Sequence, residues 1–221
     1  MKKKHPVLSW IEEGEHQQQD FKFEVSDSRK IARTLSAFAN TDGGRLLIGV
    51  KDNGVVAGVR SEEEYYMIEA ASQMYTRPEV PFSAKRWELE GKTVLEVDIA
   101  PCPERPYTAP DKDGHYKAYI RVADENILAN DVLVRSWKKR GQPDGTLLKV
   151  SRPVELLFDY LQTHEWISDR QFCRLAHLPY YVARSILSDL LAMDTLRYTV
   201  VDKRIVYQKC PSGTTYSWAF S

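Results

Sequence analysis

The segment LSAFANTDGGRLLIGVKDNGVVAG, at residues 35–58, constrains the fold of this chain more than any other part of it. The helical spacing of Ile31, Leu35 and Phe38 predicts one buried face of a helix that begins near residues 27–28. Because the spacing ends where polar and glycine residues begin, the segment predicts a helix that stops abruptly before a tight turn.

The second half of the segment predicts a buried strand between two turns. Gly43 and Gly44 can end the helix because glycine accepts the positive φ of tight turns. Residues 46–50 are uniformly apolar, as in a strand that is covered on both faces. Asp52-Asn53-Gly54 is typical of a hairpin turn. A helix, a strand and a hairpin in close succession favour an α/β fold.

A second informative element, Glu-His-Gln-Gln-Gln-Asp-Phe-Lys, occupies residues 15–22. Together with the AFAN, GG and IGV strings it resembles the Schlafen AlbA-like domain family. Tyr119-Ile120-Arg121-Val122 is similar to the Tyr-x-Arg strand found late in that family. The resemblance covers roughly residues 10–130 and implies an α/β (α+β) domain with a mixed sheet and flanking helices. One position departs from the pattern, since Asp20 stands where the family usually has glutamate.

The resemblance also implies a possible chemistry. In catalytically active Schlafens, carboxylates matching Glu15, Asp20 and Asp52 bind a divalent metal and support endoribonuclease cleavage of structured RNA. Magnesium or manganese would suit such oxygen ligands, and Lys22 would hold a phosphate or the transition-state charge. A structural interpretation stays open, in which Glu15 and Asp20 are charges at the start of a strand and Asp52 is a turn residue. Aspartate is also one methylene shorter than glutamate, which places Asp20 about 1.5 Å further from such a metal.

Composition sets further bounds. The 221 residues suffice for two domains, and 31 basic residues balance 31 acidic ones, so any attraction to nucleic acid must come from local patches. Three scattered cysteines favour neither a disulfide framework nor a zinc site. The chain contains no apolar stretch of about 20 residues and no apolar signal core near its start. We therefore expect a soluble, cytoplasmic protein that does not associate with membranes.

The pattern predicts a first domain at residues 1–137. A capping box at Ser61 opens a helix to Tyr75, and residues 82–99 predict a hairpin. A strand at 115–122 and a closing helix at 131–137 complete the domain. A basic linker rich in Gly and Pro then follows at residues 138–150.

Residues 151–221 predict a second domain. Helices at 153–164, from residue 168, and at 180–193 precede a hairpin at 196–208. This order resembles a winged helix-turn-helix domain, whose third helix enters the major groove of DNA. Eight basic residues face seven acidic ones over this segment, so a protein-docking role also fits.

The candidate nucleic-acid contacts are basic or aromatic residues from both domains and the linker. They are Lys22, Arg29, Lys30, Arg33, Arg45, Lys51, Arg121, Lys138, Lys139, Arg140, Tyr180, Tyr181, Arg184, Lys203 and Arg204. The recognition helix contributes Tyr180, Tyr181 and Arg184, and the tip of the wing contributes Lys203 and Arg204.

Three functional hypotheses follow. The first is a nucleic-acid-binding protein, specifically a DNA-binding transcriptional regulator that needs no cofactor, with DNA favoured over RNA. The second is a divalent-metal-dependent endoribonuclease, and the third is a protein-interaction adaptor. We also expect a homodimer, because a two-fold pair matches paired half-sites on DNA. The aromatic tail residues Tyr216, Trp218 and Phe220 are candidates for the dimer contact.

Overall fold

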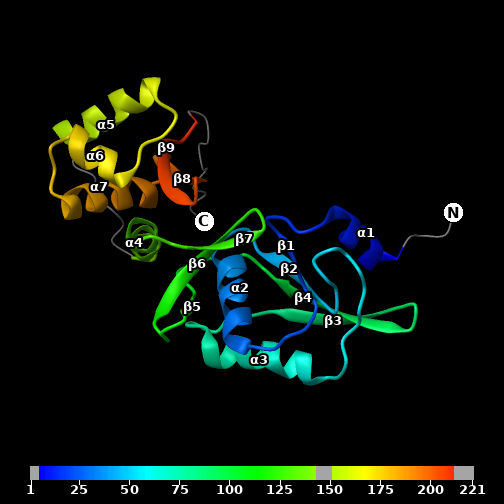
Figure 1. The fold of residues 1–221 in the computed structure, drawn as a ribbon. Coiled ribbons are helices and arrows are strands. Elements are labelled where there is room, and N and C mark those ends of the chain that lie inside the picture. Colours follow the sequence, from blue (N-terminus) through cyan, green and yellow to red (C-terminus); the bar gives the residue numbers. More distant parts are fainter. Residues whose placement is uncertain (1–4, 143–150, 212–221) are drawn as a thin grey trace, which may run out of the picture. The chain divides into compact units, whose positions relative to one another are not determined.

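The computed structural model describes residues 5–142 and 151–211, and the chain separates into two compact units at residues 129 and 130 (Figure 1). The aromatic tail and the segment 143–150 lie outside the described residues. The N-terminal unit is a mixed α/β domain, as the sequence predicts. No helix in the described ranges is long and apolar enough to cross a membrane.

A four-stranded mixed sheet forms the centre of the N-terminal unit, in the order β1-β2-β4-β3. Its strands β1 and β2 run parallel, and the other two pairs are antiparallel. A second sheet of three antiparallel strands has the order β5-β6-β7. The strands are β1 (Gln19–Lys22), β2 (Gly44–Ile48), β3 (Ser83–Leu89), β4 (Lys92–Ile99), β5 (Thr108–Pro110), β6 (Tyr116–Val122) and β7 (Glu125–Leu128).

Helices cover both faces of the four-stranded sheet. On one face, α2 (Ser28–Asn40) packs against α3 (Glu63–Tyr75) and the second sheet. The main core joins Leu35 and Phe38 of α2 to sheet residues such as Ile48. On the other face, α1 (Pro6–Glu13) contributes to a smaller core around Phe21 and Leu47. This double cover explains why the buried residues of β2, Leu46, Leu47 and Ile48, are apolar in succession.

The helix α2, which contains the AFAN string, begins and ends where the sequence predicts. Asp27 caps its start by accepting a hydrogen bond from the backbone N–H of Arg29 at 2.9 Å. The helix α3 runs from Glu63, and the capping contacts predicted at Ser61 are present. The Glu64 carboxylate accepts from the backbone N–H of Ser61 at 3.3 Å, and the Ser61 hydroxyl accepts from the backbone N–H of Glu63 at 3.1 Å. The helix α1 and the strands β5 and β7 lie where no element was predicted from the sequence.

The C-terminal unit contains four helices and a two-stranded hairpin among its described residues. They are α4 (Asp131–Arg140), α5 (Arg152–Thr163), α6 (Asp169–Leu175), α7 (Tyr180–Ala192), β8 (Leu196–Val201) and β9 (Arg204–Lys209). Ile167 pairs with Tyr207 and thereby adds a single bridging residue beside β9. A capping box of Ser168 and Gln171 starts α6.

The helix α4 groups with the C-terminal unit, whereas the sequence analysis placed it at the end of the first domain. It packs along α7, and its apolar residues Val132, Leu133 and Trp137 are buried. Lys138, Lys139 and Arg140 form its last turn and so belong to a helix instead of the predicted linker. Basic residues at this end are favourable because they complement the helix dipole.

Candidate nucleic-acid interface

The AFAN and GG motif residues hold the fold together. The buried amide of Asn40 donates to the carbonyl oxygens of Tyr107 and Tyr119 at 2.7 and 2.9 Å and accepts from the N–H of Tyr107 at 2.8 Å. Gly43 has φ of 71°, and a Cβ at Gly44 would lie 2.5 Å from the Phe38 ring. These residues therefore fix the helix end against its neighbours and leave any ligand contact to other side chains.

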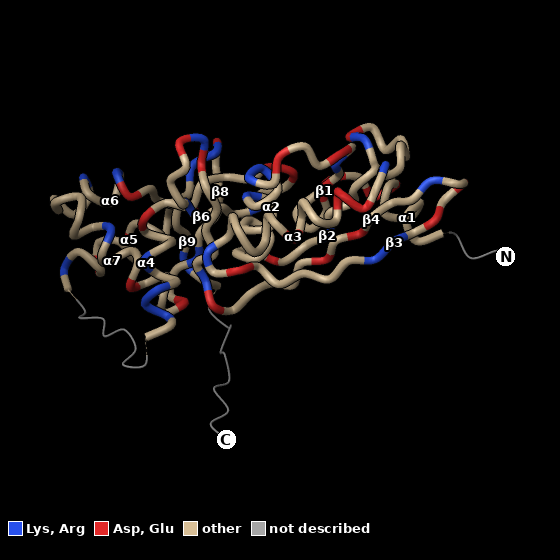
Figure 2. Tube along the Cα trace, turned by 90° about the horizontal axis from the view of Figure 1, so that it is seen from below, with Lys and Arg blue, Asp and Glu red and all other residues tan. Residues whose placement is uncertain are grey.

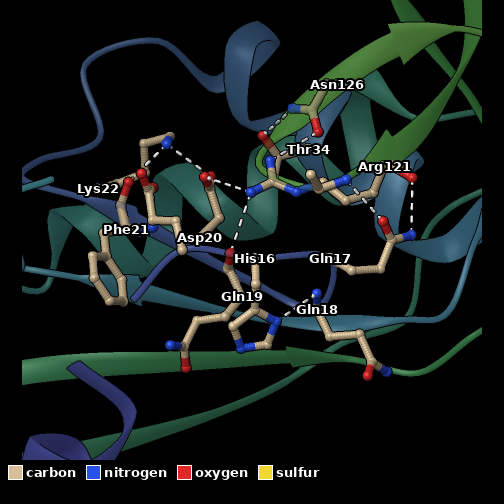
Figure 3. A network of polar contacts seen from close by, with 12 residues as sticks. His16, Gln17, Gln18, Gln19, Asp20, Phe21, Lys22, Thr34, Arg121 and Asn126 are labelled. Atoms are coloured by element: carbon tan, nitrogen blue, oxygen red, sulfur yellow. Dashed lines mark hydrogen bonds and ion pairs between the residues drawn. The ribbon is translucent and has the colours of Figure 1, made fainter. Parts of the chain in front are cut away.

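Arg121 and Asp20 form a buried ion pair between β6 and β1 (Figure 3). A guanidinium nitrogen of Arg121 lies 3.1 Å from the Asp20 carboxylate and 3.2 Å from the carbonyl oxygen of Gln19. The other terminal nitrogen donates to Asn126 at 3.2 Å. Only 1% of the Arg121 side chain is exposed, so this predicted nucleic-acid contact is enclosed within the protein.

Lys22 and Glu15 complete this charged cluster at the edge of the sheet. The Lys22 ammonium lies 2.7 Å from the second oxygen of Asp20. Glu15 accepts a hydrogen bond from the backbone N–H of Phe21 at 2.8 Å. Burial and the neighbouring Asp20 carboxylate raise the pKa of Glu15, against the opposing effects of the Phe21 N–H and Lys22. In this cluster the Asp20 carboxylate therefore pairs with two cations, Lys22 and Arg121, while the Glu15 carboxyl has a raised pKa.

Replacing Glu15 with glutamine is expected to flatten the pH dependence of stability. Because the pKa of Glu15 is raised by folding, the folded state binds this proton more tightly, and stability falls as pH rises from about 4.5 through the raised pKa. Glutamine keeps the acceptor for Phe21 and removes the ionisation. Melting temperatures between pH 4 and 8 should therefore decline less in Glu15→Gln than in the wild type.

A matched control is Glu79→Gln, which alters an exposed carboxylate in the same unit. It should leave the pH profile unchanged. Equal profiles for Glu15→Gln and the wild type would contradict the assignment of the raised pKa to Glu15.

The predicted metal site at Glu15, Asp20 and Asp52 is not assembled. Within residues 5–142 and 151–211, no three His, Cys, Asp or Glu side chains are grouped so that they could hold a metal ion. Asp20 is buried and faces two cations, while Asp52 is exposed in the hairpin turn. Since the two oxygens of the Asp20 carboxylate already face Lys22 and Arg121, these residues do not fit magnesium or manganese.

The other basic candidates of the N-terminal unit fall into two groups. Two are engaged within the domain: Arg33 donates to the carbonyl oxygen of Pro110, and Arg45 pairs with Glu96 at 2.9 Å. Three are exposed, namely Arg29, Lys30 and Lys51. The structure therefore leaves few of the predicted contacts of this unit accessible to a ligand.

The C-terminal unit contains a groove with a volume of about 810 Å³ between α6, the start of α7 and the turn of the β8–β9 hairpin. We call it the arginine groove. Its lining includes Trp166, Arg170, Arg174, Tyr180, Arg204 and Val206. Its three arginines are exposed, and their side chains make no ion pair or hydrogen bond with the described residues. Three unpaired guanidinium groups around one groove favour an anionic ligand.

The candidates on α7 differ in how accessible they are. Tyr181 is 72% exposed. Tyr180 donates to Asp169 at 2.6 Å, and this hydrogen bond raises the pKa of Tyr180. Arg184 lies 3.0 Å from Asp131 and packs over the Tyr180 ring, so it is engaged within the unit and is not free to read a base.

The basic end of α4 is partly neutralised. Lys139 pairs with Asp189, and Arg140 pairs with Asp194. Lys138 remains exposed. In the hairpin turn, both Asp202 and Lys203 have positive φ, and Arg204 follows at the groove. Tyr181 and Arg204 are therefore exposed, and neither side chain forms a hydrogen bond or ion pair with a residue that the structure describes.

Charge is distributed unevenly between the units. Residues 1–129 contain 18 Lys and Arg against 22 Asp and Glu, whereas residues 130–221 contain 13 against nine. Figure 2 shows that the two signs are nevertheless interleaved along the chain. The excess of four positive charges favours the C-terminal unit for contacts with phosphates.

Of the three groove arginines, only Arg204 belongs to the candidate set predicted from the sequence. Arg170 lies four residues before Arg174 on α6, and both line the groove. Their spacing predicts that they share a helix face, which is the signal that could have identified the pair. Arg204, which lines the same groove, lies at least 30 positions later, so its place beside them depends on tertiary structure.

Comparisons with known proteins agree with the fold of the N-terminal unit. A family model described as Schlafen, AlbA_2 matches residues 15–130, which is more than half of the chain. No curated protein matches the chain.

Two solved structures are similar to part of the chain at low identity. The DIP2311 protein from Corynebacterium diphtheriae is 22% identical, with a TM-score of 0.41, and the match covers 56% of this chain and 24% of that one. The N-terminal domain of a RecG-related protein from Nitrosomonas europaea is 20% identical, with a TM-score of 0.35. That match covers 54% of this chain and 89% of the other. The chain thus spans about a quarter of the length of the first protein.

Proposed function

The chain belongs to the Schlafen AlbA_2 family, and we propose that it is a nucleic-acid-binding protein that contacts duplex DNA through its C-terminal unit. The observation that carries this proposal is the arginine groove with its three unpaired arginines. The exposed Tyr181 directly follows the groove residue Tyr180 on α7. A DNA-binding transcriptional regulator is the role that this arrangement supports best.

The order of the C-terminal elements supports a winged helix-turn-helix interpretation. Three helices, α5, α6 and α7, precede the β8–β9 hairpin, and the Ile167–Tyr207 pairing adds a short strand position to it. In proteins of this kind the third helix enters the major groove with its N-terminal residues. We therefore assign to Tyr181, in the first turn of α7, a contact with the base edges in the major groove.

The groove arginines are assigned to the DNA backbone. Guanidinium groups bind phosphate oxygens with paired donors, and such contacts fix the position of a protein on the duplex without reading its sequence. Arg170 and Arg174 would contact the backbone from α6, while Arg204 would do so from the hairpin. No cofactor is needed for this binding, so it should persist in the presence of a chelator.

Removing the exposed Tyr181 side chain is expected to weaken binding to duplex DNA about tenfold, or about 1.4 kcal/mol. The test is fluorescence anisotropy of a labelled 24-base-pair duplex titrated with the full chain in low salt. Tyr181→Ala removes a side chain that packs against little else, so the fold should be unaffected.

Tyr66→Ala provides the matched control, because Tyr66 is an exposed tyrosine on α3 of the other unit. It should bind DNA like the wild type. A wild-type chain that fails to bind any duplex below about 100 µM would overturn the proposal, since even non-specific affinities lie near 10⁻⁴ to 10⁻⁶ M. That result would favour the protein-interaction adaptor.

The metal-dependent nuclease is not carried forward, because the surroundings of Asp20 do not suit a divalent cation. The proposed regulator is cytoplasmic and acts as a homodimer, in keeping with paired half-sites on DNA. RNA binding by the N-terminal unit would be compatible with the family. A pocket beside Arg45 in this unit is also lined by Asp42 and Asp98, which disfavours a polyanion there.

A further inference from the structure

An exposed phenylalanine with two cations over its ring stands out in the N-terminal unit. Phe23 directly follows β1, and 38% of it is exposed. The Lys51 ammonium lies 5.3 Å from the centre of its ring, and the guanidinium carbon of Arg60 lies 5.9 Å from it. We call these three residues the Phe23 platform. They come from three segments that are separate in the sequence.

The two cations of the platform are available to a ligand. Neither Lys51 nor Arg60 forms an ion pair or a side-chain hydrogen bond with any residue that the structure describes. Both are exposed, and a cation–π contact at an exposed site is weak, at about 0.5–1 kcal/mol. An anion could therefore replace the ring as their partner at little cost.

The combination of an aromatic face and two cations matches an unpaired nucleotide strand. A base stacks on an exposed ring, and lysine and arginine contact the flanking phosphates. In a duplex the base faces are already covered by neighbouring bases, so a ring of this kind gains nothing from paired DNA. An acidic peptide would use the cations but would leave the ring unexplained.

We propose that the Phe23 platform binds unpaired DNA, with one base stacked on Phe23 and the flanking phosphates held by Lys51 and Arg60. The assigned ligand is DNA because stacking on a ring and contacts to phosphates, the two interactions that these side chains offer, need no 2′-hydroxyl. The site lies apart from the arginine groove in sequence, and it adds a second kind of nucleic-acid contact to the proposed function.

The test is the affinity of the full chain for fluorescein-labelled (dT)15, measured by anisotropy. Phe23→Ala is expected to weaken binding about 5- to 150-fold, the range for losing one stacked base. Phe23→Trp should retain binding, and Phe23→Leu, which keeps apolar area without an aromatic face, should lose it. The double variant Lys51→Gln/Arg60→Gln should reduce the salt dependence by about 1.4 on the log–log slope, at about 0.7 per phosphate contact.

Two controls separate this site from the rest of the protein. Tyr66→Ala, an exposed aromatic without cations over its ring, should bind (dT)15 like the wild type. Phe23→Ala should keep the wild-type melting temperature and the wild-type affinity for duplex DNA. Duplex binding by the arginine groove and single-strand binding by the Phe23 platform are thereby tested separately.

Three results would overturn the assignment. The first is no binding of (dT)15 by the wild type below about 100 µM at low salt. The second is equal binding by the wild type and Phe23→Ala. The third is binding of (rU)15 more than tenfold tighter than (dT)15, which would assign the platform to RNA.

Discussion

Replacing Arg121 with alanine lowers the free energy of unfolding of the N-terminal unit by about 3–5 kcal/mol in our expectation, the cost of breaking a buried ion pair from one side. Asp20 would remain buried with its charge compensated only by Lys22. Gln19 and Asn126 would also lose hydrogen bonds from the guanidinium group. A loss of this size approaches the total stability of many domains.

Urea denaturation followed by circular dichroism measures the loss, and amide hydrogen exchange in β1 and β6 assigns it to this unit. Lys117→Ala, at an exposed position of the same strand, is the matched control and should cost less than about 0.5 kcal/mol. Adding Asp20→Asn to Arg121→Ala should recover part of the lost free energy of unfolding, because it removes the buried Asp20 charge that Arg121 no longer compensates. A loss below about 1 kcal/mol in Arg121→Ala would contradict a structural role for this arginine.

The second large effect concerns the arginine groove. The triple variant Arg170→Gln, Arg174→Gln and Arg204→Gln is expected to bind duplex DNA about 100-fold more weakly at 0.15 M salt. Each lost phosphate contact removes about 0.9 from the slope of log K against log salt concentration, so the slope should become shallower by about 2.7. Anisotropy titrations at several salt concentrations provide both quantities.

A second triple variant controls for the change in net charge. Arg77→Gln, Arg86→Gln and Lys112→Gln remove three exposed charges from the N-terminal unit. Its affinity and salt slope should stay close to those of the wild type. If both triple variants lose affinity equally, overall charge and not the groove accounts for binding.

Local sequence patterns predicted the elements around the motif well. The periodicity of α2, the apolar run of β2 and the turn at Asp52 each depend on neighbours in the chain, which is why their positions agree with the structure. The three helices and the hairpin of the C-terminal unit were placed correctly for the same reason. Their placement needed no knowledge of tertiary contacts.

The ion pair between Asp20 and Arg121 could not be predicted from local sequence patterns. Asp20 and Arg121 are 101 positions apart, and no local pattern indicates that one neutralises the other. Their pairing turns a predicted metal ligand and a predicted nucleic-acid contact into parts of the fold. The helix α4 was misassigned for a related reason, because its partner α7 is about 50 positions away.

The most direct test of the central claim is an NMR titration of the ¹⁵N-labelled full chain with a short DNA duplex. We expect the largest amide shifts in α6, the first turns of α7 and the turn between β8 and β9, around Arg170, Tyr181 and Arg204. Shifts confined to residues 5–129, or no shifts at protein and DNA concentrations of about 100 µM, would contradict it.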